Sequence, residues 1–341
     1  MRRIMLGKTG IEVNQLGLGG IPIQRVDEAQ AVETVVYALE KGIDFIDTAR
    51  GYTTSETWIG KALKQVDKKV ILATKSFNRT ADGVRKDVEK SLYELQTRYI
   101  DIYQCHGVRD YEEYQRIKAK GGALEGLIKA KEDGRIGHIG ITSHNLDLLE
   151  EVIDEGLFET IMVCFSLLEP KACEVVIPKA VEKGIGVIAM KPFSGGVIDN
   201  PAIALKFVLS WPEVLALAGV EAKGLVDENW EIFQGDYKLS HDEKTEIEMV
   251  RKQYDKRFCR RCDYCQPCSE GIRIQYILGI ESLVKRMGIE ALLSSPITAN
   301  VISDAKKCTE CRECVPRCPY ELPIPDLIKE KLFWLETLER Q

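Results

Sequence analysis

The segment at residues 43–52 reads IDFIDTARGY, a short apolar run that passes directly into polar and charged side chains. An apolar run, a turn and an amphipathic stretch follow one another in this order eight times between Gln15 and Gly219. The apolar runs cover residues 15–18, 43–46, 70–73, 100–104, 136–141, 160–164, 186–190 and 214–218. Helical spacing marks stretches between them, for example 28–40, 56–63, 84–95 and 170–182. Eight such units predict an α/β fold, a (β/α)8 TIM barrel, rather than an open doubly wound sheet.

Polar side chains stand at the ends of three consecutive apolar runs. Asp47 and Tyr52 follow the second run, Lys75 the third and His106 the fourth. A TIM barrel carries its active site at the carboxyl ends of its strands, so these four side chains are expected to converge on one rim. Gly19-Gly20 follows the first run without the third glycine of a dinucleotide-binding turn, which disfavours a Rossmann domain.

Eight of the 11 cysteines form two compact runs near the C-terminus, while Cys105, Cys164 and Cys173 are isolated; Cys164 and Cys173 are expected to be buried and inert. The second run has the bacterial ferredoxin spacing C-x2-C-x2-C-x3-C-P, and the first has two residues instead of three before its fourth cysteine. We predict two [4Fe–4S] clusters, and one at minimum. The expected ligand sets are Cys259, Cys262, Cys265 with Cys318, and Cys308, Cys311, Cys314 with Cys268. Structural zinc is the alternative, since paired C-x2-C units also suit tetrahedral Zn²⁺.

The stretch between the two cysteine runs has helical spacing at residues 275–287 and 289–293, and an amphipathic tail covers 322–338. This pattern predicts a small, mainly α-helical ferredoxin-type domain. The expected division is therefore a barrel at residues 1–255 and a cysteine domain at 256–341. A basic stretch at 250–257 precedes the first run and is interpreted as a solvated helix end, with docking of an acidic redox partner as the alternative.

Composition excludes several classes of protein. The chain has 341 residues, 45% of them hydrophobic, and a formal net charge of -6, so it can form a sizeable core. Its acidity disfavours nucleic-acid binding, and its N-terminal residues are not expected to be a signal peptide. No membrane span is expected, since no apolar run is long enough. We therefore expect a soluble, cytoplasmic protein. In a reducing compartment the cysteines serve metal binding, catalysis or burial rather than disulfides.

Several of these motifs together resemble the aldo-keto reductases. The motifs are Asp47-Thr-Ala-Arg-Gly-Tyr52-Thr-Thr-Ser-Glu56, Gly60-Lys-Ala-Leu63, Thr74-Lys75, His106 and Gly140-Ile-Thr-Ser143-His-Asn. The resemblance extends from Arg3 to Asn229, and with the cysteine runs the whole chain is similar to the iron–sulfur branch of that family. It implies an oxidoreductase that reduces an aldehyde or ketone, a small-molecule carbonyl substrate.

The implied catalytic group is Tyr52, Lys75, Asp47 and His106. A phenol has an ordinary pKa of about 10, and a neighbouring ammonium stabilises the phenolate, so Lys75 would make Tyr52 a usable general acid. Asp47 would hold Lys75 charged, and His106 would orient the carbonyl oxygen. The alternative for Asp47 and Lys75 is a structural ion pair at the rim.

The resemblance also implies a nicotinamide nucleotide, NADP(H) or NAD(H), across the barrel mouth. Thr142 and Ser143 would bind the carboxamide and Phe165 would stack on the nicotinamide. The loop with Lys191, Ser194 and Gly195 would cover the pyrophosphate. Lys223, Glu228 and Asn229 correspond to the adenosine end. Met162, Ser166 and Glu221 depart from the family pattern, and the preference is for NADP(H).

The fusion leaves the role of the clusters open, because a hydride carries two electrons and each cluster passes one. The clusters would feed electrons to the barrel, report redox state, or staple a domain that closes the barrel mouth. The alternative function is an electron-transfer or redox-sensing protein in which the barrel is a docking scaffold for a redox partner protein.

Overall fold

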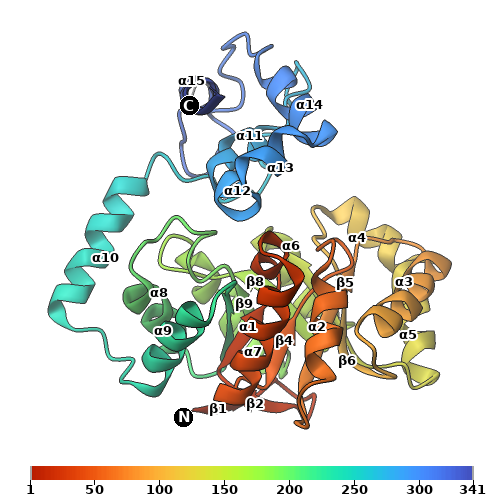
Figure 1. Ribbon diagram of the computed structural model, residues 1–341. Helices are drawn as coiled ribbons and strands as arrows, with labels where there is room; N and C mark the ends of the chain where they lie inside the picture. Colours follow the sequence, from red (N-terminus) through yellow and green to blue (C-terminus); the bar gives the residue numbers. More distant parts are fainter. Residues whose placement is uncertain (1, 340–341) are drawn as a thin grey trace. The chain divides into compact units, whose positions relative to one another are not determined.

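The computed structural model describes residues 2–339, so the predicted domain ends at residues 1 and 340–341 lie outside it. Eight parallel strands form a closed barrel in the order β10-β3-β4-β5-β6-β7-β8-β9 (Figure 1). Each of the eight predicted runs forms one strand, which confirms the (β/α)8 barrel. The strands are β3 (Leu16–Gly19), β4 (Phe45–Asp47), β5 (Ile71–Ser76), β6 (Ile100–Cys105), β7 (Ile136–Ser143), β8 (Thr160–Cys164), β9 (Gly186–Met190) and β10 (Val214–Gly219).

Helices surround the barrel and bury one apolar face against the strands. They are α1 (Glu28–Lys41), α2 (Ser55–Leu63), α3 (Ala81–Glu94), α4 (Tyr111–Lys118), α5 (Ala123–Glu132), α6 (Leu146–Glu155), α7 (Val176–Lys183), α8 (Pro201–Leu209) and α9 (Lys223–Gln234), with 3₁₀ turns η1 (Pro22–Arg25) and η2 (Pro170–Cys173). Helix α1 shows the local signals: Asp27 accepts from the Gln30 amide at its start, and Gly42 ends it at φ +120°.

The prediction of one continuous helix at 170–182 is wrong, because two separate elements cover this stretch. Pro170 opens the 3₁₀ turn η2, and α7 begins separately at Val176. Pro178 lacks an N–H and fits a helix only in its first turn, so the helix must begin shortly before it.

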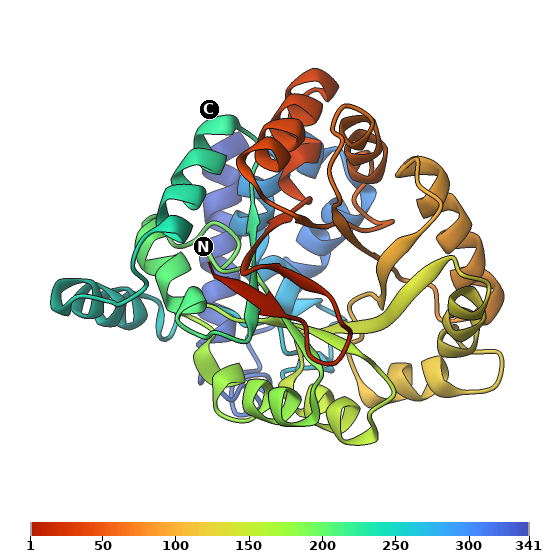
Figure 2. The same cartoon turned by 90° about the horizontal axis from the view of Figure 1, so that it is seen from below.

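A hairpin that the sequence analysis did not predict closes the amino end of the barrel. Strands β1 (Arg3–Met5) and β2 (Glu12–Asn14) are antiparallel and lie across that end (Figure 2). Their inward side chains, Ile4 and Val13, join an apolar cluster with Phe45, Ile102 and Leu215 from the barrel strands. The hairpin thus covers the amino end of the barrel interior, and the carboxyl ends of the strands form the opposite rim.

The remaining residues form a second unit, which groups residues 241–341 with 195–197. Its regular elements within 241–339 are all helices: α10 (His241–Tyr254), α11 (Ile274–Leu278), α12 (Ile280–Met287), α13 (Ile289–Leu293), α14 (Pro296–Ala305) and α15 (Ile324–Glu339). Gly279 separates α11 from α12 within the predicted helix at 275–287. Helix α10 groups with this unit, whereas the predicted boundary at 255/256 assigns it to the barrel. None of the helices among the described residues is long and apolar enough to cross a bilayer.

We predict that Gly60→Ala destabilises the barrel. An added Cβ at Gly60 in α2 would lie 2.3 Å from the carbonyl oxygen of Glu94, at the end of α3. Overpacking against main chain lowers the free energy of unfolding by about 1–3 kcal/mol, more than the helix propensity of Ala restores. Urea unfolding measures the difference. Gly224→Ala in α9 is the matched control, since an added Cβ there meets nothing within 4 Å. Equal effects at both positions would contradict the packing argument.

Candidate active site

Three neighbouring strands bring the four predicted catalytic side chains to the barrel rim. Asp47 is the last residue of β4, Lys75 lies near the end of β5, and His106 directly follows β6. Tyr52 stands on the loop between β4 and α2. Because the strands are parallel and adjacent, their carboxyl ends meet at the same edge, as the sequence predicted.

A buried ion pair forms the centre of the site. The Lys75 Nζ donates to Asp47 Oδ2 at 2.5 Å and to the carbonyl oxygen of Thr48 at 2.7 Å, and the two side chains are 2% and 5% exposed. Burial acts to lower the pKa of Lys75, but the Asp47 carboxylate and the Tyr52 hydroxyl outweigh it, so the pKa is raised. Lys75 therefore remains an ammonium at neutral pH.

Tyr52 lies beside this ammonium. The Lys75 Nζ is 4.8 Å from the centroid of the Tyr52 ring, and the Tyr52 hydroxyl oxygen accepts a hydrogen bond from this ammonium. Arg50 anchors the loop: its amide donates to the Lys75 carbonyl at 3.0 Å, and its guanidinium pairs with Glu56 and Glu94. The loop that carries Tyr52 is thus tied to the strand that carries Lys75.

His106 is the neutral member of the group. Its ring stacks on Phe77 with centroids 4.0 Å apart and meets the Tyr52 ring edge-on at 5.8 Å. Burial, together with the charges of Lys75, Arg79 and Lys191, holds the pKa of His106 well below 6.5. Within residues 2–339 its Nδ1 is buried without a hydrogen-bond partner. A neutral imidazole with an unused ring nitrogen suits hydrogen bonding to an added ligand.

Sequence reasoning missed Gln104, which lies one residue before the end of β6. Its Nε2 donates to Asp47 Oδ1 at 3.1 Å, and the side chain is fully buried. Asp47 is therefore held by Lys75 through one oxygen and by Gln104 through the other. A polar residue within the apolar run IDIYQC was the available signal.

The two predicted carboxamide ligands at the end of β7 are both engaged with the loop after β6. Thr142 Oγ1 accepts from the Gly107 amide at 2.7 Å and keeps its own proton available to donate. Ser143 Oγ donates to the Val108 carbonyl at 2.6 Å and accepts from the Asn145 amide at 3.0 Å. Of the two hydroxyls, Thr142 is the better placed to donate to a ligand.

The residues after β8 and β9 that were predicted to contact the nucleotide differ in their surroundings. Phe165 is fully buried between Phe207 and Trp211, so the structure does not present its ring face to the rim. Lys191 lies with its Nζ 2.7 Å from His144 Nε2, a contact the sequence did not predict. Ser194 and Gly195 have φ of +51° and +76°, and the Ser194 hydroxyl contacts that of Ser166 at 2.8 Å.

The predicted adenosine-end residues lie on α9. Lys223 is exposed and its Nζ is 2.5 Å from Glu33 of α1, while Glu228 is exposed and Asn229 is buried. The lysine that was expected to bind a phosphate thus already has a carboxylate partner.

The eight C-terminal cysteines form two groups of neighbouring thiols. Burial raises the pKa of Cys265 to about 12, and the thiols of Cys259, Cys262 and Cys318 act in the same direction. Burial likewise raises the pKa of Cys314, with contributions from Cys311, Cys268 and Cys308. These groups have the same members as the predicted ligand sets. Among the described residues no three or more His, Cys, Asp or Glu side chains are arranged to hold a metal ion.

The two cysteine loops also repeat each other's backbone. Arg261 and Asp263 of the first loop have φ near +60°, as do Glu310 and Arg312 at the corresponding positions of the second. After the fourth cysteine of each run, a later amide donates to its carbonyl at 3.0 Å, from Gly271 to Cys268 and from Glu321 to Cys318.

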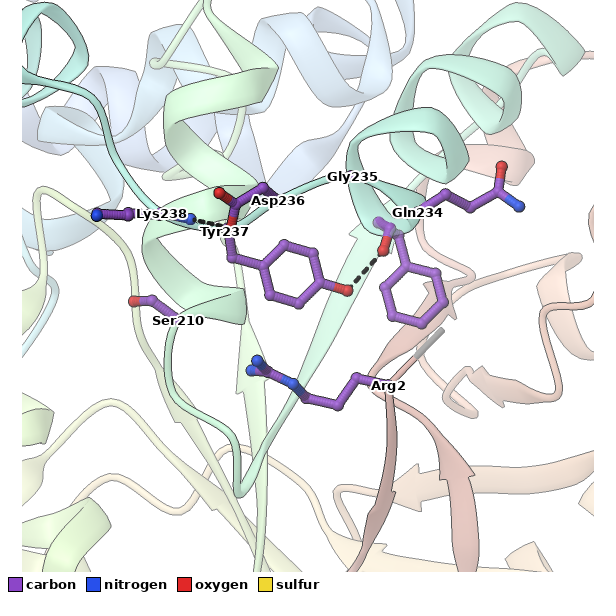
Figure 3. A pocket seen from close by; sticks show the side chains of 8 residues that line it. Arg2, Ser210, Gln234, Gly235, Asp236, Tyr237 and Lys238 are labelled. Atoms are coloured by element: carbon purple, nitrogen blue, oxygen red, sulfur yellow. Dashed lines mark hydrogen bonds between the residues drawn. The ribbon is translucent and has the colours of Figure 1, made fainter.

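A pocket elsewhere on the barrel contains none of these residues. Arg2, Ser210 and residues 233–238 line it, and Tyr237 donates to the Phe233 carbonyl at 2.6 Å (Figure 3). It lies where α9 ends, toward the amino ends of the strands, a face that serves stability in TIM barrels.

Known proteins match this barrel. Residues 15–203, more than half of the chain, match the Aldo/keto reductase family. The L-galactose dehydrogenase of Arabidopsis thaliana is 34% identical over 214 residues, which are 57% of this chain and 66% of that protein, just under two thirds of its length. The NADH-specific methylglyoxal reductase of Escherichia coli is 28% identical over 59% of this chain and 70% of that protein. The aldo-keto reductase AKR11C1 from Bacillus halodurans, in its holo form, superposes with a TM-score of 0.64 at 26% identity, covering 73% of this chain and 96% of that one.

The closed (β/α)8 barrel and the family match define the class of protein. The chain belongs to the aldo/keto reductase family. The match ends at residue 203, so both cysteine runs lie beyond it and the iron–sulfur branch stays a prediction.

We predict that His106 makes stability depend on pH. A histidine whose pKa is lower in the folded than in the unfolded chain contributes fully above the unfolded value of about 6.5 and loses that contribution as the pH falls below it. The free energy of unfolding should fall by up to about 1.4 kcal/mol per pH unit from this residue alone. His106→Gln should flatten that slope in urea unfolding between about pH 7.5 and 5.5. His241→Gln, at the start of α10, controls for loss of a histidine outside the barrel. An unchanged slope in His106→Gln would contradict the assignment.

Proposed function

We propose that the barrel reduces an aldehyde or ketone with a reduced nicotinamide nucleotide, and that Tyr52 is the general acid. One observation carries the proposal: the buried Lys75 ammonium lies between the Asp47 carboxylate and the Tyr52 ring. Asp47 compensates the charge that Lys75 would otherwise bury, and the pair presents a fixed cation to the phenol. A fixed cation beside a phenol favours loss of its proton, which is the requirement for an acid whose ordinary pKa is about 10.

The proton moves from the Tyr52 hydroxyl to the carbonyl oxygen of the substrate, where negative charge develops as the carbonyl carbon is reduced. Lys75 stabilises the phenolate that remains, and Asp47 and Gln104 hold Lys75 in place. His106, neutral at pH 7, donates a hydrogen bond that orients the carbonyl oxygen. When bound, the reduced nicotinamide supplies the hydride.

The residues present fit such a nucleotide at the nicotinamide side. His106 Nδ1 is a buried ring nitrogen without a partner in the described chain, and Thr142 retains a hydroxyl proton. We propose that Thr142 binds the carboxamide and that Ser143 acts through the loop at Val108. Lys191, Ser194 and Gly195 would lie along the pyrophosphate, and Lys223, Glu228 and Asn229 near the adenosine. Phe165 reaches a nicotinamide only if its packing against Phe207 and Trp211 changes.

Tyr52→Phe tests the mechanism. Removing a general acid costs about 10²–10⁴-fold in rate, so we expect kcat for carbonyl reduction to fall by at least about 100-fold. The dissociation constant for the nucleotide, measured by fluorescence titration, should stay within about threefold of wild type, because the hydroxyl acts on the substrate oxygen.

Tyr93→Phe is the matched control, since Tyr93 is 83% exposed on α3. Full activity in Tyr52→Phe would exclude Tyr52 as the acid. A loss of nucleotide binding equal to the loss of kcat/KM would assign it to binding instead.

We further propose that the eight C-terminal cysteines hold two [4Fe–4S] clusters. The support is the grouping of thiols into Cys259, Cys262, Cys265, Cys318 and Cys308, Cys311, Cys314, Cys268, together with the repeated left-handed backbone of the two loops. Four thiolates on one zinc ion must all lie about 2.3 Å from it, whereas a cubane places each thiolate on a different iron. The C-x2-C-x2-C-x3-C-P spacing of the second run favours the cubane.

A second candidate function is electron transfer or redox sensing, with the barrel as a docking scaffold for a redox partner. The burial of Phe165 and the pairing of Lys223 favour it, since both residues were expected to contact the nucleotide. Anaerobic titration with NADPH and NADH, followed by nucleotide fluorescence and cluster absorbance, separates the two. Bound nucleotide supports the reductase, and absence of binding supports the alternative. We also propose that the protein is cytoplasmic, since eight of its 11 cysteines have the spacing of metal ligands rather than of disulfides.

Iron analysis tests the clusters. Anaerobically purified protein should contain about eight iron and about eight acid-labile sulfide per chain. Cys314→Ser should reduce both, because Cys314 is buried among the second group of thiols. Cys173→Ala should leave both unchanged, since Cys173 belongs to the barrel. About four of each would mean one cluster, and zinc without sulfide would exclude the clusters.

A further inference from the structure

Helices α1 and α9, together with η1 and the loop after β10 that precede them, carry a set of ion pairs that the sequence did not predict. Each of three cations is paired with its own carboxylate. Lys223 contacts Glu33 at 2.5 Å, Lys41 contacts Asp227 at 2.6 Å, and Arg25 contacts Glu221 at 3.1 Å. The name α1–α9 charge network is used below for Arg25, Glu33, Tyr37, Lys41, Glu221, Lys223 and Asp227.

Tyr37 lies at the centre of this network. Its hydroxyl donates to Asp227 Oδ1 at 2.8 Å, and the ammonium groups of Lys41 and Lys223 are each 5.4 Å from its ring centroid. The three cations and three carboxylates balance, so the network has no net charge. A phosphate dianion bound here would have to compete with a carboxylate for every cation.

Glu221 is the carboxylate with the most constrained position. It follows β10, whose last residue Gly219 pairs with Gly19 of β3, and Arg25 lies in η1 just after β3. The Glu221 carbonyl accepts from Gln30 Nε2 of α1 at 3.0 Å, and its side chain accepts from Arg25. Both the main chain and the side chain of Glu221 are thus held at the carboxyl end of the barrel.

A carboxylate and a guanidinium beside the adenosine ribose favour different dinucleotides. Carboxylates accept hydrogen bonds from the 2′-hydroxyl of NAD, whereas arginine accommodates the 2′-phosphate of NADP. Here the arginine is bound to the carboxylate. Arg25 takes one of about four lone-pair positions on Glu221, so the carboxylate keeps the capacity to accept from ribose hydroxyls.

We propose that Glu221, held by Arg25, selects NAD(H) over NADP(H) by accepting from the adenosine ribose and repelling a 2′-phosphate. Glu33 contributes by occupying Lys223, the lysine that would otherwise bind that phosphate. The inference rests on the proposed function, since it requires a nicotinamide nucleotide across the barrel mouth. It reverses the preference for NADP(H) drawn from the sequence.

The test measures binding rather than turnover. Full-length protein, purified anaerobically, is titrated with NADH and NADPH by fluorescence, and with ADP-ribose and its 2′-phosphate by calorimetry. The second pair lacks the nicotinamide, so it reports on the adenosine end alone. We expect NADH to bind at least about tenfold more tightly than NADPH, and ADP-ribose to exceed its 2′-phosphate by a similar factor.

Two variants locate the effect. Glu221→Gln should reduce the preference for NADH, measured as the ratio of the NADPH to the NADH dissociation constant, by about tenfold, because it removes the charge that repels the phosphate. Glu33→Gln should also reduce this preference, because it frees Lys223 to bind the phosphate. Glu28→Gln is the matched control, because Glu28 also lies on α1 but pairs with Lys61 at 2.6 Å, outside the network. Thermal unfolding verifies that each variant is folded.

Equal or tighter binding of NADPH by the wild-type protein would overturn the inference, as would an unchanged ratio in Glu221→Gln. Both results leave the proposed reductase intact, because a nucleotide still binds. Binding of neither nucleotide would remove the proposed function and this inference with it.

Discussion

The contact between Lys75 and Asp47 is the constraint on which the barrel rim depends. Both charges are almost completely buried, and a charge removed from water costs several kcal/mol unless a partner and further hydrogen bonds compensate it. The Thr48 carbonyl supplies one such bond to Lys75, and Gln104 supplies one to Asp47. Loss of any partner would leave a buried group unsatisfied. The ion pair and hydrogen bonds that compensate the buried charges are therefore the same contacts that hold the ammonium beside Tyr52.

Much of this arrangement could be predicted from residue order alone. Each apolar run formed a strand, and parallel strands bring their carboxyl ends together, so Asp47, Lys75 and His106 had to meet once the barrel closed. The β1–β2 hairpin escaped prediction because strands of three residues are too short to show a period. Gln104 and His144 escaped for another reason: their partners, Asp47 and Lys191, are distant in sequence, and only closure of the barrel brings them together.

Charge pairing marks the limit of motif reasoning. Lys223 in the sequence indicates a cation near a phosphate, yet the structure pairs it with Glu33, which lies 190 residues away. A sequence motif shows which charged groups are present. The local electrostatic potential depends also on which of those groups are already paired with an opposite charge. The same distinction applies to Phe165. The sequence shows an aromatic ring that could stack on a nicotinamide, but in the structure this ring packs on Phe207. The structure agrees with the predicted positions of residues at strand ends, whereas Lys223 and Phe165 already have contacts that the sequence did not indicate.

The cysteine unit adds chemistry that the barrel site does not require. All four rim side chains, and the groups that hold them, belong to the first unit, and the proposed proton transfer relies on the Lys75 ammonium beside Tyr52. Proton transfer to a carbonyl needs nothing from a thiol. If the cysteines bind clusters, those clusters pass single electrons, whereas reduction of the carbonyl carbon uses an electron pair. The two cysteine loops have the same backbone conformation, with left-handed residues at corresponding positions: Arg261, Asp263, Glu310 and Arg312. The proposed proton transfer therefore depends on residues of the first unit alone.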